Sequence, residues 1–374
     1  MNIDFSDFFD QRSFKDSLTE LESPLQVGAK MKESIAGIEG VEEADIILLG
    51  CHSLNADENF HAANKIRKEL AKLYDWYPNY KVLDIGTLLR HRPEALTPTV
   101  LKAVLTELYE MDKVVILIGG SQDFILQQYA PFKTNKKPIE ITIIDQKIDL
   151  HEKEIIDEDS YLMELLLSQE NYVKHLNIVG FESYFTNPEM LETLDKLRFD
   201  CYRVGRVRED LEGMEPVFRN SDIVSIDMSV LRYSEGVFYK NPSPNGLFGD
   251  ELCALAKYSG MSEKIKSFGI AGYLPELDVH SLGAKLIAQM IWYFLDGFQL
   301  GKKELTYKTK PDNFKEYHVE VKGYPLLFIQ SKRTNRWWVQ LLNKDFIPCS
   351  NIDYHIAASG DLPDAWLRAQ ERLS

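Results

Sequence analysis

The sequence has few cysteines, no long apolar run and no dense cluster of basic residues. Its 4 cysteines are widely separated, and they form neither a CxxC pair nor a zinc-ligand spacing with histidines. We therefore expect reduced thiols in a cytoplasmic protein. No stretch approaches the roughly 18 consecutive apolar residues that indicate a membrane-spanning helix. The acidic start of the chain also lacks the basic and apolar regions of a secretory signal.

The charge balance argues against two classes of partner. The chain has 43 Lys and Arg against 58 Asp and Glu, which gives a formal net charge of -15. Because the basic residues are not gathered into a stripe, neither nucleic acid nor an anionic membrane is an expected partner. With 374 residues, the chain is long enough for one large domain with an appendage or for two ordinary domains.

Short apolar runs alternate with segments of helical spacing up to Gly301. The runs are Asp45–Gly50, Val114–Gly119, Ile139–Ile144, Leu176–Gly180 and Asp222–Ile226. The segments with helical spacing are Ala62–Tyr74, Thr97–Tyr109, Ser160–Ser168, Met190–Leu197, Gly249–Ser259 and Ser281–Phe298. Near-continuous apolar strands are typical of a sheet covered on both faces. Their alternation with helices predicts an α/β domain with a mostly parallel, doubly wound sheet.

The pattern changes after Gly301, where charged and aromatic residues alternate. We expect antiparallel strands at Glu316–Val321, Pro325–Ser331 and Trp337–Leu342, followed by a short helix at Pro363–Leu373. The predicted division is an N-terminal segment (1–40) packed on the core, an α/β domain (41–301) and a small β-rich C-terminal extension (302–374).

Polar residues follow three of the predicted strands. Side chains alternate across a strand, so Asp145, Lys147 and Asp149 are expected on one side, as are Asp227 and Ser229. A third strand ends in Gly119-Gly120-Ser121-Gln122-Asp123, whose glycines permit a tight turn. Ligands of parallel sheets bind beyond the carboxyl ends of the strands, so these three ends are expected to meet in one crevice.

These three segments resemble the GGDHS, DAHxD and SxDxD fingerprints of the arginase, agmatinase and formimidoylglutamase (ureohydrolase) family, in the same order. The resemblance covers roughly residues 41 to 300, and Ile270–Asp278 is most similar to the formimidoylglutamase branch. It implies the three-layer α/β/α fold of that family. It leaves assembly into a homo-oligomer open.

The resemblance implies a pair of manganese ions held by six side chains, and several of these are replaced. The corresponding positions hold Gln122, Asp145, Lys147, Asp149, Asp227 and Ser229. Both histidines are absent, and a charged lysine has no lone pair for a metal and repels one. We therefore hypothesise that no metal or other cofactor binds, and that the Lys147 ammonium ties Asp145, Asp149 and Asp227 into a salt-bridge cluster.

Two other interpretations of the acidic cluster stay open. The DQKID stretch could be a charged strand end exposed to water. Alternatively, Asp145, Asp149 and Asp227 could hold a single magnesium or calcium ion together with the carbonyl of Gln122.

Two further residues are candidates for substrate binding. Glu251 matches a family glutamate that accepts hydrogen bonds from an amidine or guanidine group, although it could equally be a solvated residue near a helix amino terminus. His151 closely follows the DQKID segment. Together with His52 and His175 it lies near a predicted strand end, where a histidine could transfer protons or be an ordinary loop residue.

The C-terminal extension carries the adjacent pair Trp337 and Trp338. Alternation would place one ring inward and the other outward. An outward aromatic could anchor a partner protein, or it could pack against the main domain or a second subunit.

The sequence is therefore compatible with two functions. The first is a catalytically inactive relative, a binding or scaffolding protein whose acidic pocket suits a small cationic or amidine ligand. The alternative is an active manganese-dependent hydrolase of linear amidines, acting on a compound such as N-formimidoyl-glutamate. Fold alone does not decide between them, so the site must.

Overall fold

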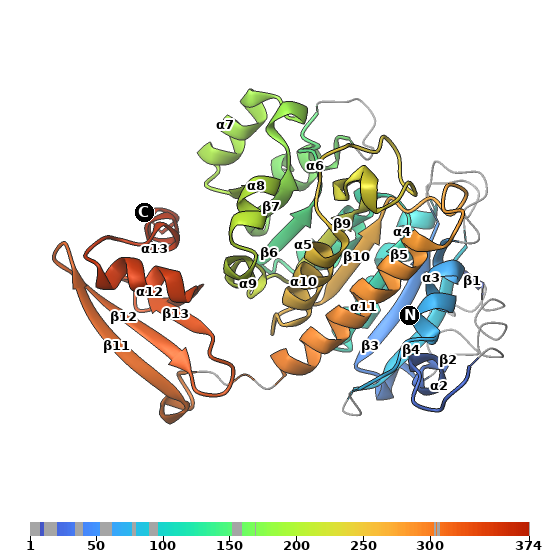
Figure 1. Ribbon diagram of the computed structural model, residues 1–374, viewed down its shortest axis with the longest axis horizontal. Helices are drawn as coiled ribbons and strands as arrows, with labels where there is room; N and C mark the ends of the chain where they lie inside the picture. The colour runs from blue at the N-terminus through green and yellow to red at the C-terminus, as the bar shows by residue number, and fades with distance from the viewer. Residues whose placement is uncertain are drawn as a thin grey trace.

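The computed structural model describes most of the chain. The described residues are 8–10, 21–33, 40–52, 62–76, 80–89, 96–151, 159–168, 170–302, 304 and 307–373. They form an α/β core and a smaller C-terminal body beside it (Figure 1).

The core is built on a ten-stranded sheet. Nine strands follow the order β1-β4-β3-β5-β10-β9-β6-β7-β8, and the tenth, β2, also pairs with β4. Only β1 runs antiparallel, against β4. The strands are β1 (Phe9–Asp10), β2 (Lys32–Glu33), β3 (Ile46–Cys51), β4 (Val82–Leu88), β5 (Val114–Gly119), β6 (Ile139–Ile144), β7 (Val173–Phe181), β8 (Asp200–Arg203), β9 (Ile223–Asp227) and β10 (Ser267–Ala271). The central strands are buried along their length because both faces of the sheet are covered.

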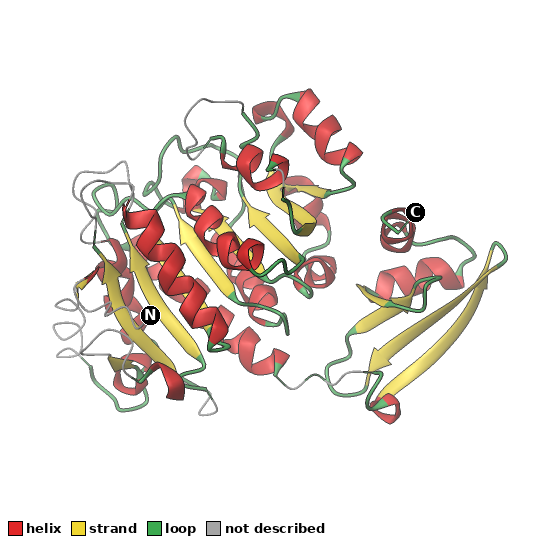
Figure 2. Ribbon diagram, turned by 180° about the vertical axis from the view of Figure 1, so that it is seen from behind, coloured by secondary structure: helices red, strands yellow, loops and turns green. Residues whose placement is uncertain are grey.

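Helices form a layer on each face of this sheet, as Figures 1 and 2 show from opposite sides. The first layer holds α3 (Ala62–Ala71), α8 (Val204–Glu209), α9 (Glu215–Phe218), α10 (Gly249–Gly260) and α11 (Leu282–Gly301). The second layer holds α4 (Leu96–Glu110), α5 (Ile125–Thr134), α6 (Tyr161–Leu167) and α7 (Pro188–Lys196). A short helix, α2 (Val27–Lys30), precedes β2. This is the arginase-like arrangement that the sequence predicted.

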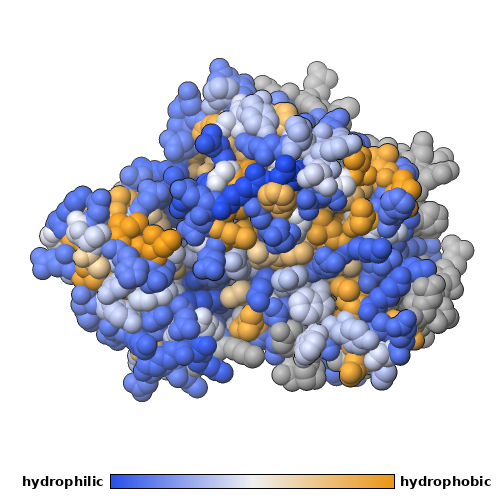
Figure 3. Space-filling view, viewed as in Figure 1, coloured by the Kyte–Doolittle hydropathy of each residue, from blue (hydrophilic) through white to orange (hydrophobic). Residues whose placement is uncertain are grey.

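The C-terminal residues form an antiparallel sheet of four strands in the order β11-β12-β13-β14. The elements are β11 (Phe314–Val321), β12 (Tyr324–Ser331), β13 (Trp337–Gln340), β14 (Phe346–Cys349), α12 (Asn351–Ala358) and α13 (Asp364–Glu371). The predicted separate β-rich extension is therefore confirmed, whereas the domain boundaries at 40 and 301 stay a prediction. Within the described part of the chain no helix is long and apolar enough to cross a membrane. The face in Figure 3 is mostly hydrophilic, with scattered apolar groups.

The strand pairing brings the predicted site segments together. Ile144, the last residue of β6, pairs with Ile226 of β9. Asp227 in turn pairs with Ala271, the last residue of β10. The turn after β5 depends on its glycines, because Gly119 has φ +84° and a Cβ there would lie 2.7 Å from the carbonyl oxygen of Cys51. The carboxyl ends of β5, β6, β9 and β10 therefore border one space.

Candidate functional site

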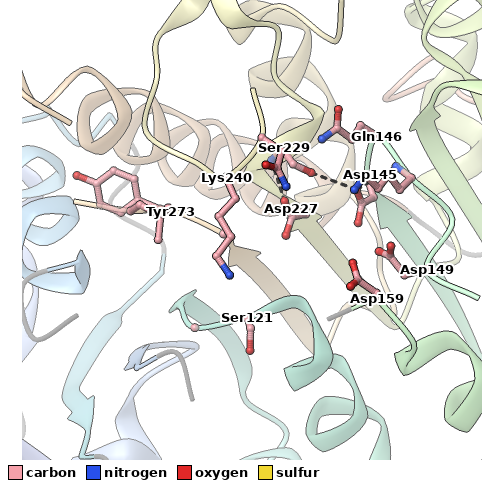
Figure 4. Close-up of a pocket in the computed structure, with 14 residues that line it drawn as sticks. Ser121, Asp145, Gln146, Asp149, Asp159, Asp227, Ser229, Lys240 and Tyr273 are labelled. Carbon is pink, nitrogen blue, oxygen red and sulfur yellow. Dashed lines mark hydrogen bonds between the residues drawn. The ribbon is translucent and has the colours of Figure 1, made fainter. Parts of the chain in front are cut away.

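A cavity of about 100 Å³ lies at the carboxyl ends of β5, β6, β9 and β10. We call it the crevice. It is lined by Gly120, Ser121, Asp145, Gln146, Lys147, Asp149, Asp159, Asp227, Ser229, Lys240, Asn241, Gly272, Tyr273 and Leu274. Figure 4 shows its aspartates gathered on one side and Lys240 and Tyr273 on the other.

Asp145 and Asp149 form the centre of the acidic side. Both are almost fully buried, with 3% and 5% exposure, and both line the crevice. Asp145 Oδ1 accepts hydrogen bonds from the Lys147 backbone N–H and the Ser229 hydroxyl, both at 3.2 Å.

The pKa values of this pair are shifted upward. Burial, followed by the charges of Asp149 and Asp227, raises the pKa of Asp145 well above its usual range. Burial also raises the pKa of Asp149, and the charge of Asp227 adds to this shift. The acidic side of the crevice therefore favours a positively charged group beside it.

Asp227 ends β9 beside this pair. Its Oδ1 accepts a hydrogen bond of 2.7 Å from the backbone N–H of Ser229, which orients the carboxylate. Gly272, with φ +79°, approaches so closely that a Cβ there would lie 2.9 Å from both carboxylate oxygens of Asp227. Glycine at position 272 therefore keeps space for this carboxylate.

Lys147 does not play the role predicted for it. It lines the crevice and is half-buried, but no salt bridge joins it to Asp145, Asp149 or any other residue in the described ranges. Its charge acts from a distance, as a minor influence that lowers the pKa of Asp149. The predicted salt-bridge cluster is therefore not formed among the described residues.

Sequence reasoning missed three residues that line the crevice: Asp159, Lys240 and Tyr273. The Lys240 side chain extends into the space between Asp227 and Ser121 (Figure 4). Lys240 lies in a loop between β9 and α10, where no periodicity predicts the direction of a side chain. Tyr273 was within a segment singled out for its resemblance, and its position directly after β10 was the available signal.

Gln122, which stands where the family has a histidine, does not line the crevice. Its Oε1 accepts a hydrogen bond of 3.1 Å from the Ser225 hydroxyl, and it is not among the lining residues. Three side chains near the cluster keep a buried polar atom without a hydrogen-bond partner among the described residues: Gln122 Nε2, Gln146 Oε1 and the Tyr161 hydroxyl. Of these, only Gln146 lines the crevice.

Glu251 and the predicted histidines do not line the crevice either. Glu251 Oε2 accepts a hydrogen bond of 2.7 Å from the backbone N–H of Phe248, and Arg208 lies 3.4 Å from its Oε1. Glu251 thus lies in the first turn of α10 as the alternative expected, but it is buried and not solvated, and its role in substrate binding stays a prediction. His151 is exposed and His52 follows β3. His175 lies near the amino end of β7, whereas the crevice lies at the carboxyl ends of the strands.

The tryptophan pair packs inward on both sides of its strand. Trp337 is buried in the C-terminal core and stacks on Tyr354 at 5.0 Å between ring centroids. The Trp338 ring lies 4.6 Å from the guanidinium carbon of Arg219, a core residue. The half-buried Trp338 ring therefore packs against the main domain, as one alternative expected, and a role of the pair in binding a partner protein stays a prediction.

Comparisons with known proteins agree with this architecture. No protein-family model matches the chain. Formimidoylglutamase of Staphylococcus haemolyticus is 25% identical over 255 residues, which are 62% of this chain and 76% of that protein. Among solved structures, formimidoylglutamase of Bacillus subtilis superposes with a TM-score of 0.63 and 18% identity, over 72% of this chain and 90% of that one.

Two further structures extend the comparison. Formiminoglutamase of Trypanosoma cruzi with Mn²⁺ has a TM-score of 0.63 and 13% identity, over 70% of this chain and 95% of that one. Agmatine ureohydrolase of Thermoplasma volcanium has a TM-score of 0.59 and 17% identity, over 78% of this chain and all of that one (100%). The chain thus has the arginase-like α/β fold and is similar in sequence to a formimidoylglutamase, as its motifs predicted.

Proposed function

We propose that this ureohydrolase-fold protein binds a small ligand in its crevice and does not hydrolyse it through a two-metal centre. The observation that carries the proposal is the set of side chains at the crevice. At two positions where the resemblance implies metal ligands, Lys147 brings an ammonium and Ser229 a hydroxyl that donates to Asp145. The chain is then a binding or scaffolding relative of the formimidoylglutamases.

The side chains at the crevice do not fit a pair of manganese ions. Two divalent ions bring four positive charges, which ligands and a bridging water balance in active centres, where that water becomes the nucleophile. Here the Ser229 hydroxyl donates to Asp145, and the Gln122 amide accepts from Ser225. Within the described ranges no group of three or more His, Cys, Asp or Glu side chains is arranged to hold a metal ion.

Positive charge of the chain itself also opposes metal binding. Lys147 lines the crevice, and the Lys240 side chain extends into it. Two unit charges 4 Å apart interact by about 4 kcal/mol at an effective dielectric constant of 20, and an ammonium repels a divalent ion correspondingly more strongly.

The same geometry supports a small cationic or amidine ligand. Four aspartates line the crevice: Asp145, Asp149, Asp159 and Asp227. The Gln146 carboxamide is 3% exposed, lines the crevice and makes no hydrogen bond with the described residues. A ligand that carries positive charge and N–H donors would pair with the carboxylates and satisfy this amide. The cavity of about 100 Å³ suits a group of a few heavy atoms.

The alternative function is a manganese-dependent hydrolase of linear amidines. The observation in its favour is the sequence similarity to a protein named formimidoylglutamase, a name for an enzyme that acts on a formimidoyl compound. The two functions differ in product formation and not only in binding.

The test measures both properties on the full chain. Urea or formamide release would be assayed with arginine, agmatine and N-formimidoyl-glutamate, with and without added Mn²⁺. Acetamidinium binding would be measured by calorimetry, with neutral acetamide as the matched probe. We expect no turnover, and acetamidinium binding that Asp227→Asn weakens at least about tenfold, as expected for a hydrogen bond to a charged group. Asp361→Asn, at an exposed position, is the control. Turnover at ordinary enzyme rates of about 1 s⁻¹ or more would support the alternative instead.

A further inference from the structure

The C-terminal module, defined as residues 314–373, has a hydrophobic core of its own. This core contains Val321, Leu326, Phe328, Trp337, Val339, Leu341, Cys349, Ala357, Trp366 and Ala369. None of the hydrophobic clusters formed by the described residues contains members of both the module and the α/β core. Figures 1 and 2 show the module as a separate body beside the core. Its attachment must therefore come from other contacts.

The first attachment point is Glu215 of α9. Its carboxylate pairs with Arg219 of the core and, at 3.0 Å, with Arg336 of the module. Arg336 also donates a hydrogen bond of 2.9 Å to the carbonyl oxygen of Met261 in the core. Arg219 reaches back to the module, where it donates to the Trp337 carbonyl oxygen and lies over the Trp338 ring. Arg219 and Arg336 are each 5% exposed, so these charges are buried by docking.

The second attachment point is Asp200, the first residue of β8. Two module arginines on or next to α13 contact its carboxylate: Arg368 at 2.6 Å and Arg372 at 3.0 Å. His175 of the core lies 3.0 Å from the same carboxylate. Arg198 of the core adds a hydrogen bond to the carbonyl oxygen of Glu371.

A buried polar chain connects the two attachment points inside the core. His175 contacts the Asn177 amide at 3.1 Å, and Asn177 donates to Thr142 at 3.2 Å. Thr142 shares a 2.8 Å hydrogen bond with Ser221. The Ser262 hydroxyl then bridges the carbonyl oxygens of Ser221 and Arg219 at 2.9 and 3.0 Å. Asn177 and Thr142 lie within β7 and β6, and the other residues of the chain lie nearer the amino ends of the strands, away from the crevice.

We propose that the C-terminal module is a separable unit, docked on the core near the amino ends of the strands by two groups of ion pairs, one at Asp200 and one at Glu215. We call these two groups the latch. Releasing a hydrophobic interface would expose apolar surface to water. Releasing this one instead returns arginines and carboxylates to water, which solvates them well. Interfaces of this polar kind between domains permit relative motion. The module can therefore leave the core while both parts stay folded.

The test compares full-length variants by small-angle X-ray scattering and calorimetry. The core-side variant combines Asp200→Asn and Glu215→Gln. The module-side variant combines Arg336→Met, Arg368→Met and Arg372→Met, which keep most of the side-chain volume. For both we expect a larger radius of gyration than for the unmodified chain, unchanged helix content by circular dichroism and two separate thermal transitions.

The control is Asp361→Asn, which breaks an exposed ion pair with Lys322 inside the module and is expected to change neither measurement. The latch is overturned if both variants keep the original radius of gyration and a single transition. It is also overturned if both variants lose helix content, because the charged residues would then be needed for the folding of the core and of the module themselves. The latch is supported if only the core-side variant loses helix content and the module-side variant keeps its helix content but has a larger radius of gyration.

Discussion

Asp145 and Asp149 are buried together just beyond the end of β6, and neither forms an ion pair with Lys147 between them. Both stand at positions where the ureohydrolase resemblance implies metal ligands. Burial raises the pKa of both carboxyl groups. The Lys147 ammonium therefore lines an acidic crevice without pairing with either of these two aspartates.

Lys147→His, which restores the family's residue type, is predicted to bring no manganese. Since Lys147 forms no salt bridge within the described ranges, its removal breaks no ion pair of Asp145 or Asp149. The free energy of unfolding should change by less than about 1 kcal/mol, as for most surface substitutions. Elemental analysis and urea denaturation check this prediction. Stoichiometric manganese in the variant would show that the lysine alone had excluded the metal.

Gly272→Ala is predicted to destabilise the protein and disturb Asp227. The added Cβ would lie 2.9 Å from both carboxylate oxygens, at a φ of +79°. The matched control is Gly323→Ala, where φ is +83° and nothing lies within 4 Å. The crowding should cost about 1–3 kcal/mol beyond the control, measured by chemical denaturation. Equal losses in the two variants would mean that Asp227 has room to move.

Much of the site follows from the sequence because strand rules apply there. Buried parallel strands put Asp145, Asp227 and the Gly119-Gly120 turn at one edge of the sheet. The direction of Lys147 could not be predicted, because β6 ends at Ile144 and side-chain alternation ends with it. The strand β4 and the helix α12 were also not identified from the sequence.

Tertiary contacts account for the remaining differences. The Gln122 amide is held by Ser225, which is 103 positions away along the chain. Arg219 reaches the Trp337 carbonyl across 118 positions. Neither contact leaves a periodic signal in the sequence, so local patterns predict the fold and the acidic cluster but not the partners of these side chains.

Arg67→Met is predicted to destabilise the core by about 3–5 kcal/mol, because it leaves a buried carboxylate unpaired. Arg67 contacts Asp84 through Nε at 2.6 Å and Nη2 at 2.9 Å, and both side chains are almost fully buried. Lys322→Met, which breaks an exposed pair with Asp361, should cost far less, because water screens this pair. Urea denaturation of both variants checks the difference, and a similar small loss in each would contradict the structure at Arg67.

Docking of the C-terminal module is predicted to weaken in acid. Burial raises the pKa of Asp200, but the hydrogen bond from His175 and the charges of Arg372 and Arg368 outweigh it and lower this pKa to about 2. A carboxyl group with a depressed pKa stabilises the folded state above its unfolded pKa of about 3.9, and this contribution is lost as pH falls through the folded value.

The loss should be on the order of 2 kcal/mol between about pH 4 and pH 2. Asp200→Asn should remove this part of the pH dependence. Denaturation curves of the two proteins across that range check the prediction. Parallel curves would show that Asp200 does not contribute to it.

The most direct test of the central claim is the manganese content of the unmodified chain after equilibration with Mn²⁺ and removal of the free ion. We expect far less than one manganese ion per chain, with the acidic crevice still able to bind acetamidinium. Two tightly held ions per chain, together with formamide or urea release, would contradict it.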